Sequence, residues 1–138
     1  MEPTSGLFPN VVKFLDRPGW LVEDWAGKDA TRKPLRLIEA RTRFVKQDLT
    51  KYVSSVQAVL LNPLPGRAGW QDVLGNALKS AHEALVMVVP LPFSDPYGTR
   101  VVDGALRFNH VELLVWFEHW TVKEEFDSVH TVFYVSKR

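Results

Sequence analysis

The sequence predicts an α+β domain in which a mainly antiparallel sheet packs on one principal helix. Two observations predict this class. Residues 70–85 carry apolar side chains at helical spacing, whereas the other apolar stretches alternate with period two or form short runs bounded by proline and glycine, as strands do. The expected order is an irregular N-terminal arm, two strands, a helix, a strand and two hairpins. The sheet becomes a sandwich if it folds over on itself.

The expected arm comprises residues 1–34. Prolines and glycines break it into pieces too short to be independently stable helices. The first piece is a helical turn that Asn10 can cap, and the second is a short segment at 20–25. Together they carry more large apolar side chains than they can bury between themselves. The arm must therefore dock, either on its own domain, residues 35–138, or on a neighbouring copy.

The middle of the chain contains three expected strands and the helix. Residues 36–46 alternate between apolar and charged, which predicts a half-buried strand. Residues 56–61 are apolar on both faces and predict a central strand. After a loop rich in proline and glycine, the stripe over residues 70–85 predicts the principal helix, and residues 85–89 predict a buried strand.

The last third of the chain is expected to form two hairpins. Asp103 and Gly104 stand between two short apolar stretches, and this pair is typical of a tight type I′ turn. Residues 111–122 and 129–135 are dense in β-branched and aromatic side chains, which predicts a long hairpin closed by a charged turn at 123–128.

Composition limits the classes of protein that fit. With 138 residues and 15.7 kDa the chain is one domain, and a formal net charge of +1 calls for neither nucleic acid nor membrane by itself. The absence of cysteine excludes disulfides, thiolate metal sites and a cysteine nucleophile. The sequence has no recognisable targeting segment and no apolar run long enough to span a membrane. We therefore expect a soluble, intracellular, cytoplasmic protein.

Catalytic motifs do not emerge from the sequence. His110 and His119 are nine residues apart, so on one straight strand they point to opposite faces. No serine stands in a nucleophile turn or has an evident partner histidine. The loop at 66–69 lacks the ending of a phosphate loop, so a plain turn is the simpler interpretation. We expect no enzymatic activity, no metal and no cofactor. The histidines considered are His82, His110, His119 and His130.

Charge is distributed unevenly along the chain. Residues 28–51 hold eight basic and three acidic side chains, a net charge of +5. This predicts a basic patch suited to the phosphates of RNA or of an anionic membrane, and the alternative is a solvated strand face. The residues expected to bind the anionic surface are Arg32, Lys33, Arg36, Arg41, Arg43 and Lys46.

Tryptophan is the other unusual feature, with five in a small domain. Trp116 and Trp120 share one face of the expected last strand, so either the arm or another subunit must cover them. We predict a homo-oligomer formed by exchange of the arm between copies. The residues expected to mediate self-association are Phe8, Val12, Leu15, Trp20, Trp25, Trp116 and Trp120.

The order of strand, proline-bearing loop, helix, apolar strand and long hairpin over residues 56–135 resembles the small matrix proteins of non-segmented negative-strand RNA viruses, of the rhabdovirus and bornavirus kind. The segment 110–118 looks like their alternating C-terminal strand. The resemblance implies a structural or adaptor protein that binds membranes through a basic patch and polymerises through an exchanged N-terminal segment, in the cytoplasm, at a membrane or in a virion.

Two other functions stay open. One is a small intracellular inhibitor or immunity-type protein that recognises a single protein partner through Trp116, Trp120 and the acidic turn. The other is a hydrolase or metal enzyme, which metal analysis of the purified protein would test.

Overall fold

The computed structural model describes residues 8–25, 43–46, 49, 53–61, 70–89, 99–102, 106–126 and 131–138. Within these ranges the chain forms three helices and eight strands. In chain order they are α1 (Phe8–Leu15), β1 (Leu21–Trp25), β2 (Arg43–Lys46), β3 (Val56–Leu61), α2 (Trp70–Ser80), β4 (Ala81–Val89), β5 (Thr99–Val102), β6 (Leu106–Asn109), α3 (His110–Trp116), β7 (Trp120–Phe126) and β8 (Thr131–Lys137).

Six of the strands form one mixed sheet in the order β2-β1-β3-β4-β8-β7. The first four are parallel to one another, and β8 runs antiparallel to both of its neighbours, β4 and β7. The α+β content was predicted, but the expected mainly antiparallel sheet is wrong. The described strands form a single large sheet and a two-stranded one rather than a sandwich. Because parallel strands need crossover connections, this sheet depends on pairings between distant residues that no local pattern encodes.

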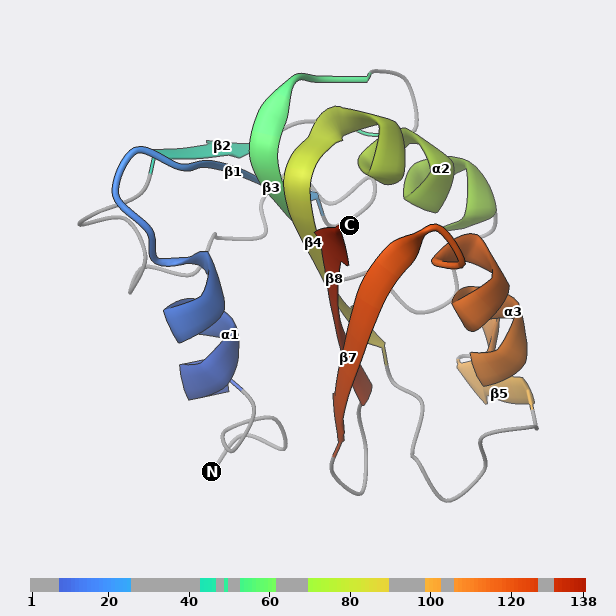
Figure 1. Ribbon diagram of the computed structural model, residues 1–138. Coiled ribbons are helices and arrows are strands. Elements are labelled where there is room, and N and C mark those ends of the chain that lie inside the picture. The colour runs from blue at the N-terminus through green and yellow to red at the C-terminus, as the bar shows by residue number, and fades with distance from the viewer. Residues whose placement is uncertain are drawn as a thin grey trace.

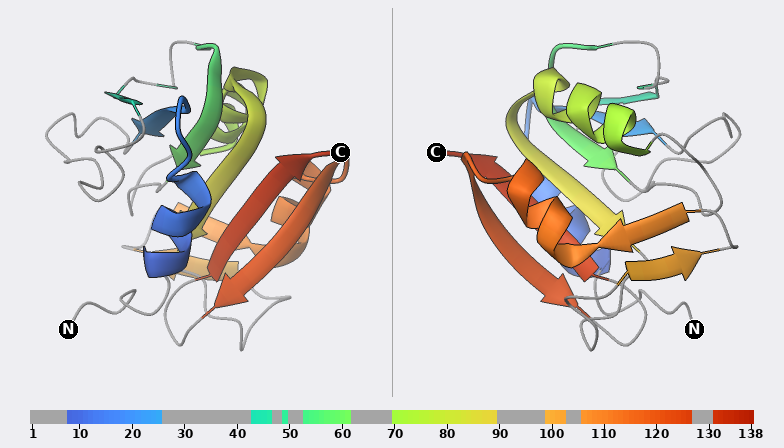
Figure 2. Two further views of the ribbon diagram at one scale, coloured as in Figure 1. Left: turned by 60° about the vertical axis from the view of Figure 1, so that its left-hand side comes forward. Right: turned by 90° about the vertical axis from the view of Figure 1, so that its right-hand side faces the viewer.

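Helices cover both faces of the sheet. Figure 1 shows α1 on one side and α2 and α3 on the other. The short β5–β6 hairpin lies apart from the main sheet, beside α3 (Figure 2). Helices on both faces are the usual consequence of parallel strands, whose two sides are both apolar.

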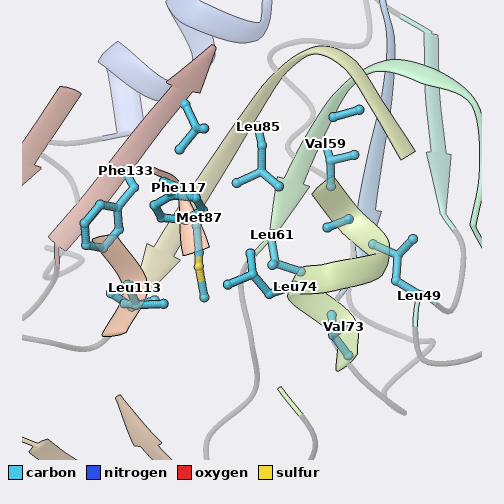
Figure 3. Close-up of a cluster of buried hydrophobic side chains, with 14 of the residues drawn as sticks. Leu49, Val59, Leu61, Val73, Leu74, Leu85, Met87, Leu113, Phe117 and Phe133 are labelled. Atoms are coloured by element: carbon cyan, nitrogen blue, oxygen red, sulfur yellow. The ribbon is translucent and has the colours of Figure 1, made fainter. Parts of the chain in front are cut away.

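The face under α2 and α3 holds the larger core. Its side chains come from β3, β4 and β8 and from both helices, and the ring centroids of Phe117 and Phe133 are 5.6 Å apart. Leu49, which lies between β2 and β3, is also fully buried here. The largest buried side chains on this face (Figure 3) are Leu49, Leu61, Leu74, Leu85, Met87, Phe117 and Phe133.

The face under α1 is built from smaller side chains. Ala58, Ala84 and Val86 leave room for α1 to approach the sheet closely, and Leu15 of α1 is fully buried against them. The chain then turns into β1 through Gly19, whose φ of 82° is one that side-chain-bearing residues rarely adopt. Residues 8–25, expected to belong to an irregular arm, thus form a helix and an inner strand of the sheet. The second arm segment is a strand rather than a helical turn.

The principal helix begins where it was predicted but ends earlier. It stops at Ser80, and β4 begins at the next residue. Ser80 Oγ donates a hydrogen bond to the Asn76 carbonyl, 2.7 Å away, within the last turn of the helix. Beyond this point the apolar residues of the expected stripe, Ala81 and Leu85, are buried in β4, whereas His82 and Glu83 between them are exposed. Periodicity alone did not separate these apolar residues from a helical stripe.

Other predictions had mixed outcomes. The central strand at 56–61 is confirmed. The β5–β6 hairpin is confirmed, with Val102 opposite Leu106; its turn lies outside the described residues. The expected strand at 111–122 is wrong, because residues 110–116 form α3 and β7 begins only at Trp120. The apolar side chains buried from this segment, Leu113 and Phe117, are four residues apart, which is helical spacing.

Candidate functional site

The sheet has a topological switch point between β1 and β3. From β1 the chain passes to β2 on one side, and then crosses to β3 on the other side, where β4 follows. In open parallel sheets, ligands bind in the crevice outside the carboxyl ends of the strands at such a point. Here those ends are Trp25 of β1 and Leu61 of β3. The segments that follow them, 26–42 and 62–69, lie outside the described residues.

Two acidic residues stand in β1 close to this point. Asp24 is the residue before the carboxyl end of the strand. Glu23 is fully buried; its Oε1 accepts a hydrogen bond from Ser54 Oγ at 3.3 Å, and its Oε2 has no partner in the described structure. Burial raises the pKa of Glu23 above its ordinary value of 4.5, and the Ser54 hydrogen bond lowers it in part.

The hydrogen bonds around Ser54 lie at the amino ends of β3 and β4. The Ser54 backbone N–H donates to Ser80 Oγ at 2.9 Å, and Asn76 Nδ2 donates to the Leu49 carbonyl at 2.5 Å. These contacts tie the end of α2 to the segment that leads into β3. They form the edge of the sheet opposite the crevice, so they stabilise the fold without reaching a ligand there.

One serine does have a partner histidine, contrary to the expectation from sequence. Ser55 Oγ and His82 Nε2 are 2.5 Å apart, because the pairing of β3 with β4 brings together residues 27 positions apart. Both side chains are exposed, and within the described residues no carboxylate is bonded to His82. The pair lies at the amino edge with Ser54. It is a surface hydrogen bond, without the third member or oxyanion donors of a catalytic triad.

The histidines other than His82 show no metal-ligating group within the described residues. His110 begins α3 and His119 follows it, so the argument from strand parity does not apply. His130 lies outside the described residues. No group of three metal-ligating side chains occurs in the part of the chain that the structure describes.

The residues of the predicted basic patch are only partly described. Arg43 and Lys46 are the first and last residues of β2, the edge strand. Arg32, Lys33, Arg36 and Arg41 lie outside the described residues. The patch and its anionic partner, RNA or membrane, therefore stay predictions. None of the described helices is long and apolar enough to cross a membrane.

The residues predicted to mediate self-association are spread over both faces of the sheet. Leu15 of α1 and Trp20 are buried on the α1 face of the sheet, and Val12 of α1 is partly buried there. Phe8 begins α1 and Trp25 ends β1. Trp116 and Trp120 do not share a strand: one ends α3, the other begins β7, and both pack partly against the core on the opposite face. The predicted homo-oligomer is untested by this single chain.

Comparison of the sequence with known families finds no matching family model, and no curated protein matches significantly. Comparison of the fold finds many solved structures. Magnesium protoporphyrin IX methyltransferase from Synechocystis PCC 6803, solved with bound SAM, superposes with a TM-score of 0.63 at 11% identity, over 94% of this chain and 77% of that one.

Two further neighbours are also methyltransferases. An O-methyltransferase family protein from Burkholderia thailandensis has a TM-score of 0.59 at 13% identity, over 97% of this chain and 57% of that one. The glycopeptide N-methyltransferase MtfA has a TM-score of 0.56 at 7% identity, over 99% and 91%. At these identities the likeness establishes the fold, which is methyltransferase-like.

This finding corrects the interpretation of the sequence. The resemblance to viral matrix proteins is wrong, because the fold is that of solved methyltransferases such as those named above. The expectation of a non-enzymatic structural protein or inhibitor, with no enzymatic activity, is contradicted with it. The order of elements on which that resemblance depends is wrong at residues 110–116, which form helix α3 rather than a strand.

Proposed function

We propose that this chain is a SAM-dependent methyltransferase that binds the methyl donor at the carboxyl ends of β1 and β3. The observation that carries the proposal is the superposition on a methyltransferase with bound SAM over 94% of this chain. The switch point between β1 and β3 supports it independently, because it marks the expected ligand crevice from strand order alone.

The described residues at the crevice suit the charge of the donor. SAM carries a positive sulfonium centre, and when bound it supplies an electrophilic methyl group. Asp24 stands beside the carboxyl end of β1, where a carboxylate favours a cationic ligand. The chain would bind the donor in the crevice and orient its methyl group toward an acceptor.

The acceptor is not part of this proposal. The neighbours named above include a magnesium protoporphyrin IX methyltransferase, an O-methyltransferase family protein and a glycopeptide N-methyltransferase. A shared fold therefore serves very different acceptors, because function depends on residues placed on the fold. The proposal covers the donor and the reaction class.

Isothermal titration with SAM and with S-adenosylhomocysteine tests the donor site. We expect saturable binding of one molecule per chain, with SAM bound about tenfold or more weakly by Asp24→Asn because a negative charge near the cationic donor is lost. Glu83→Gln removes the same charge at an exposed position near the amino end of β4, at the opposite edge of the sheet, and should bind like the unaltered protein. No binding of either compound to the unaltered protein contradicts the proposal.

A further inference from the structure

A groove lies on the α1 face of the sheet, between that helix and the last two strands. It has a volume of about 620 Å³ and is lined by α1, by Arg17 just after it, and by β7 and β8. Thr121, Lys123 and Glu125 line it because alternation along β7 directs them away from Trp120 and Val122, which pack on the other face. In Figure 1, α1 and the β7–β8 hairpin flank this region. The strand ends of the donor crevice do not contribute to it.

Positive charge predominates in the lining of the groove. Lys13 and Arg17 come from the α1 side and Lys123 from β7, against the single carboxylate of Glu125. All three cations are exposed. In the described structure neither Lys13 nor Lys123 forms an ion pair, so both ammonium groups are available to a ligand. This concentration of charge contrasts with a net charge of +1 for the whole chain.

The carboxylate of Glu125 is already engaged on both oxygens. Tyr134 Oη donates to Oε1 at 2.8 Å and Asn10 Nδ2 donates to Oε2 at 2.7 Å. These bonds fasten α1 to the β7–β8 hairpin. Burial and the bond to Glu125 raise the pKa of Tyr134, so its hydroxyl keeps its proton and remains the donor. Glu125 is thus committed to holding α1 against the β7–β8 hairpin, which leaves Lys13 and Lys123 to face a ligand.

The groove also has aromatic walls. Phe14 and Tyr134 line it with their ring centroids 5.2 Å apart. The Arg17 guanidinium lies 4.4 Å from the centroid of Trp20 and 5.3 Å from that of Phe14, which holds this cation over the aromatic rings. A ligand here meets aromatic surface and cations together. The volume falls within the range of pockets for small molecules.

We propose that this groove binds a nucleotide, with its phosphate between Lys13 and Lys123 and its base against the partly exposed ring of Phe14. A phosphate dianion matches the excess of positive charge, and a flat base matches the aromatic walls. The site lies on the α1 face and is separate from the crevice proposed for the methyl donor. It is therefore an additional binding site, and it does not depend on the proposed methyltransferase function.

Titration with adenosine 5′-monophosphate tests the site directly. We expect saturable binding to the unaltered protein, weakened about tenfold or more in the double variant Lys13→Glu, Lys123→Glu. Lys79→Glu reverses an exposed charge in α2, on the opposite face, and should leave the affinity unchanged. Thermal unfolding of the variants confirms that they fold. Absence of binding to the unaltered protein, or equal affinity in the double variant, overturns the proposal.

Two further titrations test the chemistry and the position of the site. Adenosine and inorganic phosphate should each bind more weakly than adenosine 5′-monophosphate, because each keeps only half of the contacts. Affinity for the nucleotide should fall as salt rises. Saturating S-adenosylhomocysteine should leave nucleotide binding intact. Displacement of the nucleotide by S-adenosylhomocysteine would place it in the donor crevice and overturn the proposal of a separate site.

Discussion

The face of the sheet under α2 and α3 carries leucine, methionine and phenylalanine side chains, whereas the face under α1 carries mostly alanine and valine. Two helices are needed to cover the large side chains of the first face. The small side chains of the second let one short helix pack closely over the middle of the sheet. The β7–β8 end of that second face is left open, and the groove with Lys13 and Lys123 lies there.

The larger core and the proposed nucleotide groove thus lie on different faces of the sheet. The core under α2 and α3 has more fully buried side chains, and larger ones, so it contributes more hydrophobic free energy of folding than the core under α1. The α1 face combines a smaller core with charged side chains and a cavity. Five substitutions test whether the two faces differ in this way, and those with the greater expected effect come first.

Phe117→Ala should have the largest effect. The side chain is fully buried and packs on Phe133, so truncation removes apolar burial and leaves a cavity. We expect the free energy of unfolding to fall by about 3 to 5 kcal/mol, measured by chemical denaturation. Val115→Ala, two residues earlier in α3, is the control, because Val115 is 60% exposed. Equal losses in the two variants would contradict the assignment of the main core to this face.

Leu15→Ala tests the α1 face. Leu15 is fully buried, and we expect a loss of about 2 to 4 kcal/mol, toward the lower end because a short helix can shift to fill the cavity. Unfolding should also be followed over a range of protein concentration. A midpoint that does not change with concentration places α1 on its own sheet, whereas a midpoint that rises with concentration supports the predicted arm exchange.

Tyr134→Phe tests the fastening between α1 and the β7–β8 hairpin. The ring stays in place against Phe14, but Glu125 Oε1 loses its hydrogen-bond donor. We expect a loss of about 1 kcal/mol in the free energy of unfolding. A matched Asn10→Ala variant removes the donor to the other oxygen, at an exposed position. It should cost less, and a larger loss in Asn10→Ala than in Tyr134→Phe would contradict this description of the groove.

Gly75→Ala should stabilise the face under α2 and α3. The glycine is inside α2, and an added methyl group would lie 3.6 Å from the Trp116 ring, an ordinary contact distance. Alanine restricts the unfolded chain and favours the helix, so we expect a gain of about 0.5 to 1 kcal/mol in thermal or chemical denaturation. A loss of stability would mean that Trp116 packs more tightly on α2 than this distance allows.

Glu23→Gln should change how stability depends on pH. The pKa of Glu23 is raised above 4.5 in the folded state. Just above pH 4.5 the folded protein therefore holds a proton that the unfolded chain releases. Its contribution to stability is complete below pH 4.5 and is lost as the pH rises through the folded pKa. The variant should therefore lose less stability than the unaltered protein between pH 4.5 and neutrality. Identical pH profiles would contradict the raised pKa.

Local patterns in the sequence predicted those elements that depend on neighbouring residues. The strand at 56–61, the start of α2 and the β5–β6 hairpin each have their own signal in composition or turn residues. The parallel pairing of β1 with β2 and β3 had none, because it joins segments far apart in the sequence. Helix α3 was missed although Leu113 and Phe117 have helical spacing, since β-branched and aromatic residues around them favour strands.

The candidate sites could not be predicted from the sequence for the same reason. Asp24 acquires meaning only when strand order places the end of β1 at a switch point. Ser55 meets His82 only through the pairing of β3 with β4. Lys13 and Lys123 line one groove because α1 packs beside β7. Each juxtaposition depends on tertiary structure, whereas sequence patterns relate only residues within one segment.

The position of β8 has a consequence for synthesis of the chain. Residues 131–137 leave the ribosome after the other described strands, yet they take an inner place between β4 and β7. Until they emerge, β4 has an unpaired edge along its apolar residues 84–89, a surface prone to pair with other chains. The nascent protein must therefore delay completion of its sheet, and a chaperone that shields this edge would govern how much of it reaches the native state.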